Sequence, residues 1–286
     1  MLREIRSLGF EWAELSHGIR ISLLPGIMEA FDAGEIKISS LHNFCPLPMG
    51  VNHAAPNIFK FTALDKRERE NAWRHSVKTI ETAARLKALV VVLHMGCVDM
   101  KDYTERLLEL VAAGKKETSK YESLCEEVME KREKRKQEHM DLAGEMLTRL
   151  ADKAEEHGVR LGIENRQALE EVPFDSDFDL FMREFNRPSI GYWHDCGHAQ
   201  IKENLGFLSH RLHLENMAPR LIGFHLHDVE FPGRDHRPPG SGNVDFASLR
   251  GVVKPEHVKV FELSPSLSPE AALGGVAHLK KLWGEE

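Results

Sequence analysis

Cysteine is scarce in this sequence, and its spacing excludes two kinds of scaffold. The 286 residues include four cysteines, Cys45, Cys97, Cys125 and Cys196, and no two of them form a CxxC pair. Zinc knuckles require closely spaced cysteines, and disulfide frameworks are typical of short secreted chains. We therefore expect four reduced thiols, with neither a zinc knuckle nor a disulfide framework.

Long apolar runs are also lacking. No stretch approaches the roughly 18 consecutive apolar residues that suggest a membrane-spanning helix. The N-terminal stretch "MLREIRSLGF" carries charge early and lacks the apolar core and cleavage site of a signal peptide. These absences predict a soluble cytoplasmic protein with no membrane partner.

An excess of positive charge is missing as well. The formal net charge is -7 at pH 7. Non-specific affinity for nucleic acids comes largely from clustered Lys and Arg. The charge balance therefore argues against a nucleic-acid partner.

What the sequence does contain is an alternation of short apolar runs with longer amphipathic segments, which is typical of a parallel sheet with crossover helices. Seven runs have the apolarity of strands buried on both faces, namely residues 10–16, 36–44, 88–95, 159–165, 190–196, 221–228 and 258–264. A parallel α/β barrel often uses about 250 residues as one domain. We therefore predict an α/β barrel, with residues 1–286 forming a single domain.

One helical region is too long for a simple crossover. Residues 101–157 include "EEVMEKREKRKQEH", which is polar on all sides. We interpret residues 101–140 as a helical insertion that forms a solvated, projecting arm. A role of this arm in dimerisation, and hence a homo-oligomer, or as a lid is the alternative.

Residues that can bind metals or move protons mark the ends of six successive predicted strands. They are His42, His94, Glu164, Asp195, His225 and Glu262. Active sites of parallel barrels are built at this rim from several strands. A single such residue is better explained by core packing, but six on one rim favour a functional site, because buried carboxylates are costly unless they are paired or bind a metal.

The mixture of donors favours a divalent cation. Carboxylate oxygens and neutral imidazole nitrogens suit Mn, Co, Zn or Mg, and cysteine ligands are absent from the set. We therefore expect one divalent metal ion with positions left open for substrate.

The motifs "LGIEN", "HDCGHA", "GFHLHD", "GSGNVDF" and "VFELS" occur in the order seen in the xylose isomerase-like TIM barrel superfamily, and the chain resembles this family over nearly its whole length. The resemblance implies a (β/α)8 TIM barrel that lacks the usual first strand and carries the insertion after the fourth family strand. It also implies four metal ligands, Glu164, Asp195, His225 and Glu262. His198 and His236 match histidines that bind substrate or a further metal.

Neighbouring residues in these motifs have other expected roles. Strand alternation directs His194 away from Asp195 and towards the outer helices, whereas His227 shares a face with His225 and stays an alternative ligand. Cys196 is expected to fill space. Gly240 and Gly242 are expected to form a turn, with a phosphate cradle as the alternative.

The resemblance implies an enzyme, a metal-dependent sugar isomerase or epimerase that acts on a ketose or keto-sugar. Glu164 and Glu262 would then exchange the proton next to the carbonyl. The expected substrate-binding residues are His42, His94, His198, His236 and Arg166. A lyase of the inosose dehydratase type would use the same metal and the same proton abstraction.

Two further alternatives come from other classes of protein. An AP endonuclease-like phosphodiesterase is one, because eight residues match most of the three-metal set of that family: His42, His94, Glu164, Asp195, His198, His225, His236 and Glu262. Against it, Arg234 stands where the aspartate of that set belongs, and Asp235 is expected to point elsewhere. The other alternative is a non-catalytic accessory barrel.

Overall fold

All seven predicted strands are present in the computed structural model, which describes residues 1–285. The chain forms two compact units. Within the described residues, the first comprises residues 1–96, 139–164 and 182–191, and the second comprises residues 97–138, 165–181 and 192–285. The single domain over residues 1–286 stays a prediction.

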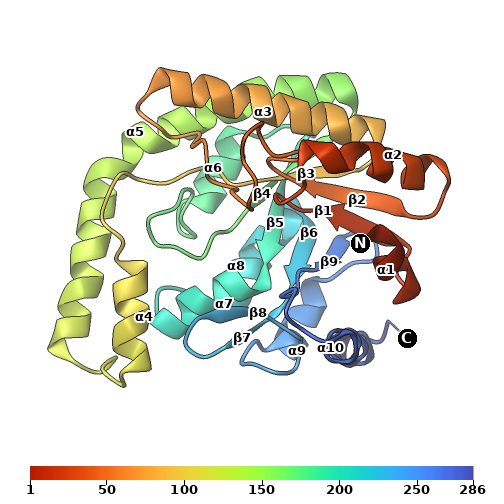
Figure 1. Ribbon diagram of the computed structural model, residues 1–286. Coiled ribbons are helices and arrows are strands. Elements are labelled where there is room, and N and C mark those ends of the chain that lie inside the picture. Colours follow the sequence, from red (N-terminus) through yellow and green to blue (C-terminus); the bar gives the residue numbers. More distant parts are fainter. Residues whose placement is uncertain (286) are drawn as a thin grey trace. The chain divides into compact units, whose positions relative to one another are not determined.

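The first unit contains four parallel strands in sequence order. These are β1 (Trp12–Leu15), β2 (Lys37–His42), β3 (Val90–Leu93) and β4 (Arg160–Glu164). Its helices are α1 (Leu2–Ser7), α2 (Leu24–Asp32), α3 (Lys66–Arg85) and the second half of α5 (Ser119–His157). Figure 1 shows α3 in orange, packed beside β2 and β3.

The second unit continues the same pattern. Its parallel strands are β6 (Leu221–Leu226), β9 (Val258–Phe261) and residues 192–195 of β5 (Ile190–Asp195), whose first two residues belong to the first unit. The strands β7 (Asp228–Glu230) and β8 (Arg234–Arg237) pair as an antiparallel hairpin. Its helices include α4 (Thr104–Ala112), the first half of α5, α7 (Cys196–Leu205), α8 (His210–Met217), α9 (Phe246–Leu249) and α10 (Pro269–Trp283). The short helix α6 (Phe178–Glu184) has residues in both units.

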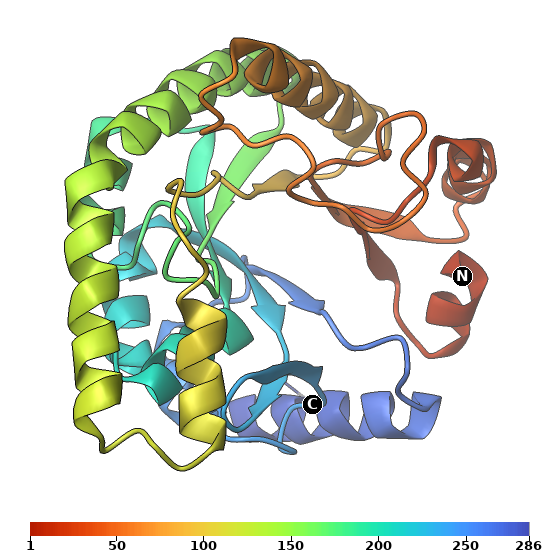
Figure 2. The same ribbon diagram turned by 60° about the vertical axis from the view of Figure 1, so that its left-hand side comes forward.

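The predicted polar insertion is helical, but it is not polar on all sides. Helix α4 lies alongside the first half of α5 (Figure 2). In that half of α5, Tyr121, Leu124, Val128 and Arg132 are buried. Their spacing of three or four residues gives the helix one inward stripe. The expectation of a fully solvated arm was therefore wrong, because an arginine occupies one of the stripe positions and the window looked uniformly polar.

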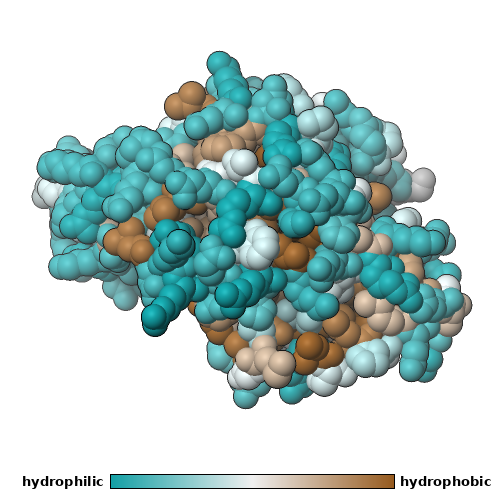
Figure 3. Space-filling view, turned by 90° about the horizontal axis from the view of Figure 1, so that it is seen from above, coloured by the Kyte–Doolittle hydropathy of each residue, from teal (hydrophilic) through white to brown (hydrophobic). Residues whose placement is uncertain are grey.

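Several large apolar side chains are exposed among the described residues. Met49, Leu64 and Leu180 are exposed. On the face shown in Figure 3, apolar colour appears in small groups among hydrophilic residues. No helix within residues 1–285 is both long and apolar enough to cross a membrane.

The outer face of β5 carries a buried hydrogen-bond chain. The Tyr192 hydroxyl lies 2.8 Å from His194 Nδ1 and 2.8 Å from His213 Nε2. His194 Nε2 lies 2.8 Å from His210 Nε2, and His210 Nδ1 lies 3.3 Å from Gln200 Oε1. Because the amide oxygen only accepts, one set of neutral tautomers satisfies the chain, with protons donated from His213 towards Gln200.

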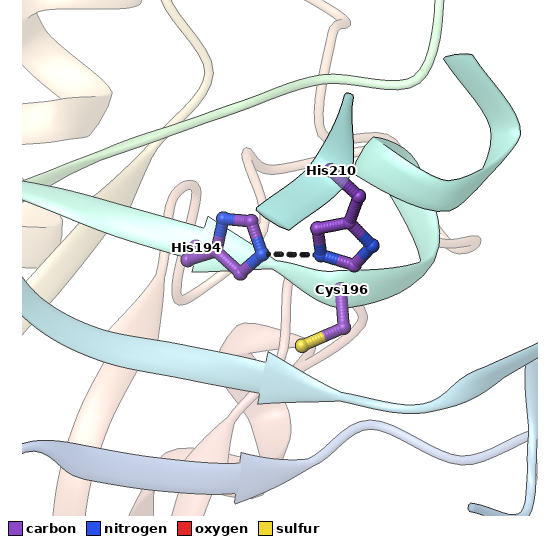
Figure 4. Close-up of side chains that lie close together, drawn as sticks. All are labelled: His194, Cys196 and His210. Atoms are coloured by element: carbon purple, nitrogen blue, oxygen red, sulfur yellow. Dashed lines mark hydrogen bonds between the residues drawn. The ribbon is translucent and has the colours of Figure 1, made fainter. Parts of the chain in front are cut away.

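Two histidines of this hydrogen-bond chain also belong to a group of residues that could bind a metal. His194, Cys196 and His210 lie close together and are buried (Figure 4). Burial raises the pKa of the Cys196 thiol well above its ordinary value. The two imidazoles already bond to each other, so the group is a satisfied part of the core, and His194 points towards α8 as strand alternation predicts.

The buried histidines of this hydrogen-bond chain make the free energy of unfolding depend on pH. Burial lowers the pKa of His210 to about 3 and that of His213 to about 4. An unfolded histidine titrates near 6.5, so the unfolded chain binds protons that the folded chain does not, and stability falls as the pH decreases from about 6.5 to about 4. We expect His213→Gln, which keeps a donor towards Tyr192, to reduce the slope by at most about 1.4 kcal/mol per pH unit.

Urea unfolding at several pH values measures this slope. The exposed His53 supplies the control, and His53→Gln should retain the wild-type slope. An unchanged slope in His213→Gln would contradict the assignment.

Candidate functional site

In the first unit, three predicted residues meet at the ends of neighbouring strands. His42 ends β2, His94 follows β3, and Glu164 ends β4. The Glu164 Oε2 atom lies 2.8 Å from His94 Nε2 and 3.6 Å from His42 Nε2. All three side chains are buried.

The tautomers of these histidines determine what the group can hold. His42 Nδ1 lies 3.0 Å from the backbone oxygen of Asn43, and His94 Nδ1 lies 3.0 Å from Asn57 Oδ1. If the Nδ1 atoms of His42 and His94 donate to these oxygens, both rings are neutral. Their Nε2 atoms then carry lone pairs that face the Glu164 carboxylate. Acceptors that face each other need a proton or a cation between them, so the group fits a bound cation or a protonated imidazole.

The ring of His17 belongs to this group and was not predicted. Its centroid lies 4.7 Å from that of His42, edge to face. His17 follows β1, where a single histidine in a short loop gives no periodic signal. Its position after the strand was the available clue.

In the second unit, the predicted ligands from β5, β6 and the end of β9 converge. His225 Nδ1 lies 3.1 Å from Glu262 Oε2 and 3.7 Å from Asp195 Oδ2. Asp195 and His225 are fully buried, and the Glu262 side chain is 24% exposed. Two carboxylates and one imidazole that meet in this way form a suitable donor set for a divalent cation, with one side accessible to solvent.

His227 lies beside this set and contacts Asp195. Its Nε2 atom lies 3.1 Å from the Asp195 carboxylate, and its Nδ1 atom accepts the backbone N–H of His236 at 3.0 Å. Both ring nitrogens are engaged, so His227 orients Asp195 in the way that outer residues orient metal ligands. Gly197 is required beside it, because a Cβ atom there would lie 2.0 Å from His227 Cε1.

Asp195 is held as a carboxylate. Burial alone would raise its pKa, but His198 and His227 outweigh burial and hold the pKa well below its ordinary value. The backbone N–H of His198 also donates to Asp195 Oδ1 at 2.7 Å. An ionised, oriented carboxylate is the form that binds a cation.

His198 and Arg166 lie together beside Asp195. His198 Nδ1 lies 3.4 Å from Asp195 Oδ2 and 3.3 Å from Arg166 Nη1. Arg166 also pairs with Glu171 at 3.1 Å, and the two side chains are 12% and 11% exposed. Both side chains are therefore too buried to form a plain surface salt bridge.

The hairpin β7–β8 corrects one expectation. Arg234 points outward, is 70% exposed and pairs with Glu230, whereas Asp235 Oδ1 lies 2.9 Å from His236 Nδ1. The expectation that Asp235 points away from the site was therefore wrong, because its carboxylate contacts His236. The backbone of His236 has a φ of +55°, so regular strand alternation does not hold at this position of β8.

His236 carries charge in this arrangement. Burial lowers its pKa, but the nearby carboxylates of Asp235 and Glu262 outweigh burial and raise the pKa to about 10. A charged imidazole donates hydrogen bonds and does not coordinate a metal. The geometry therefore suits His236 as a hydrogen-bond donor at the site.

The glycine turn after β8 is built around Asp228. The Asp228 carboxylate accepts the backbone N–H groups of Gly240, Gly242 and Val244 at 2.9, 2.8 and 3.0 Å. A Cβ atom at Gly242 would lie 2.2 Å from the Val229 oxygen, which explains the glycine. The phosphate cradle considered from the sequence is wrong, because these amides are already occupied.

We expect Asp228→Asn to destabilise the protein. The backbone N–H of Val229 also donates to this carboxylate at 2.8 Å, so four backbone donors share its charge. The substitution removes that charge and turns an amide N–H towards one of the four, so the free energy of unfolding should fall by about 3 kcal/mol. Denaturant unfolding measures the loss. Glu230→Gln, on the same strand and exposed, is the control and should change stability by less than about 0.5 kcal/mol.

The strand order and the residues at the strand ends define a class, that of parallel α/β barrels. The family model described as "Xylose isomerase-like TIM barrel" matches residues 2–282, and the chain belongs to this family. The fold predicted from the sequence is thereby confirmed. No curated protein is significantly similar to the chain in sequence.

Solved structures share the fold at low sequence identity. A D-tagatose 3-epimerase-like protein is 19% identical with a TM-score of 0.71, over 99% of this chain and 92% of its own. The 3-keto-D-glucoside 4-epimerase from E. coli is 15% identical with a TM-score of 0.67, over 98% and 92%. The IOLI protein, solved with a bound zinc atom, is 16% identical with a TM-score of 0.66, over 99% and 92%.

Proposed function

We propose that the protein is an enzyme, a sugar isomerase or epimerase that depends on a divalent metal and exchanges a proton next to a carbonyl group. The observation that carries this proposal is the convergence of Asp195, His225 and Glu262 in the second unit. The names of the epimerases that share the fold support the same class of substrate.

The metal site we propose adds Glu164 to these three residues. The four match the ligands implied by the family motifs, and Glu164 is a buried carboxylate like Asp195. His227 keeps Asp195 oriented, and the chemistry of the donors suits Mn, Co, Zn or Mg. The zinc atom in the IOLI structure is consistent with this set.

The residues of this chain then divide the work of proton exchange. A metal bound there would polarise the carbonyl oxygen and lower the cost of an enediolate. Glu164 and Glu262 act as the proton-transferring pair, one removing the proton and the other returning it. His198, His236 and Arg166 orient the hydroxyl groups of the sugar, and His42 and His94 are the other substrate-binding residues that we propose.

Two alternative activities, a lyase and a phosphodiesterase, would use some of the same residues. A lyase acting on a keto-sugar would begin with the same proton abstraction and end with loss of a hydroxyl group. A phosphodiesterase with several metals gains support from the cation-competent group of His42, His94 and Glu164, and from Asp235 beside His236. The net charge of -7 opposes it, because affinity for nucleic acids comes largely from clustered positive charge.

The proton-transfer roles predict the behaviour of two conservative variants. Glu164→Gln and Glu262→Gln should each reduce solvent deuterium exchange on a substrate ketose by about 1,000-fold or more, because an amide cannot accept the proton. NMR of a ketose panel in deuterated water measures exchange. Near wild-type exchange in either variant would remove that glutamate from the mechanism.

Metal stoichiometry separates the candidate functions. Elemental mass spectrometry of the purified protein should give one Mn, Co, Zn or Mg per chain, and His225→Ala should lose it. Arg234→Ala, whose side chain points outward, is the matched control and should retain it. Two or three zinc ions per chain would favour the phosphodiesterase, and no metal would favour an accessory protein.

A further inference from the structure

The helical insertion contains a fully buried arginine whose contacts all go to one loop. Arg132, in the first half of α5, donates from Nη1 to the backbone oxygens of Leu169 and Glu171 at 3.0 and 2.9 Å. Its Nη2 atom donates to Asp177 Oδ2 at 3.1 Å, and the guanidinium lies 5.1 Å from the ring of Phe174. The partners all belong to residues 169–177, which follow β4.

The loop that Arg132 holds is the one that positions Arg166. Glu171 accepts Arg166 Nε at 3.1 Å through Oε1 and the backbone N–H of Ala168 at 3.2 Å through Oε2. Arg166 then reaches His198, which lies beside Asp195. A continuous series of contacts therefore runs from the insertion to the proposed substrate-binding residues.

Other contacts fix the insertion to the same loop and to two more elements of the site. Glu170 accepts the backbone N–H and hydroxyl of Thr104 and the N–H of Tyr103, at the start of α4. The Tyr121 hydroxyl donates to the Leu205 oxygen at the end of α7, the helix that carries His198 near its start. Leu108 of α4 packs against Gly233, in the turn of the hairpin that carries His236, where a Cβ atom would lie 2.7 Å from Leu108 Cδ2.

The choice of arginine indicates orientation rather than simple space filling. Removing a guanidinium from water costs several kcal/mol, and an apolar side chain of similar volume would avoid that cost. The planar fork can bond two carbonyl oxygens and a carboxylate in fixed directions, which an ammonium group cannot do. The buried charge therefore specifies the path of the loop.

We propose that the insertion is an intramolecular clamp for the substrate side of the site, and that Arg132 is the positioning residue that sets Arg166 through Glu171. The effect of the clamp on the reaction rests on the proposed function, whereas its effect on the order of residues 166–177 does not. The order of the loop is independent of the reaction. The clamp also gives the insertion a function within its own chain.

The first measurement concerns the loop alone. Hydrogen exchange followed by mass spectrometry should show amide exchange in residues 166–177 faster by about tenfold or more in Arg132→Met and in Arg132→Lys, while exchange in β5 and β6 is retained. Lys134→Ala is the control, because Lys134 lies on the same helix and its exposed side chain pairs only locally with Glu130. Unchanged exchange in both Arg132 variants would overturn the clamp.

The second measurement links the clamp to the site. With a ketose that the wild type exchanges, Glu171→Gln and Arg132→Lys should each raise KM by about tenfold and change kcat by less than about twofold. We expect Glu171→Gln to fold, so it serves as the test variant if Arg132→Met does not fold. In an Arg166→Ala background, the same substitutions should raise KM by less than about twofold, because their effect passes through Arg166.

The possible results separate the two proposals. Additive effects on KM in the Arg166→Ala background would overturn the positioning role. If no ketose is exchanged by the wild type, the proposed function fails, and the amide exchange of residues 166–177 still decides whether the clamp exists.

Discussion

The candidate site of the second unit depends on keeping one fully buried carboxylate ionised. Asp195 is fully buried, and an unpaired buried carboxylate would cost several kcal/mol. The His198 backbone and the His227 ring supply its hydrogen bonds. The fixed ring of His227 in turn requires glycine at position 197 and engages the backbone of His236, so the start of α7 and the hairpin β7–β8 are shaped by the same requirement.

Much of the fold could be predicted because its strands are buried on both faces. Continuous apolarity identifies such strands without any need for periodicity, and all seven were located within a few residues of their ends. The polar residues at those ends then followed from a general rule about parallel barrels. Within each unit, the structure places the predicted side chains near one another, and their roles in binding and catalysis stay predictions.

The errors arose where local rules did not apply. Alternation along β8 assumed an extended backbone, but the positive φ at His236 brings Asp235 to the site and leaves Arg234 outside. The inward stripe of α5 was hidden because Arg132 is polar in composition and buried in fact. Asp228 was overlooked because its partners are backbone groups 12 to 16 residues away, which no side-chain pattern reveals.

The Asp228 carboxylate acts as a permanent internal anion for the turn that follows β8. A turn that becomes ordered only when its amides bind a ligand loses conformational entropy on binding, and this loss reduces the affinity for the ligand. Here that ordering occurs once, during folding. A neutral sugar of the kind proposed above would therefore bind without an entropic penalty from this segment, and a phosphorylated one would gain no anion-binding amides from it.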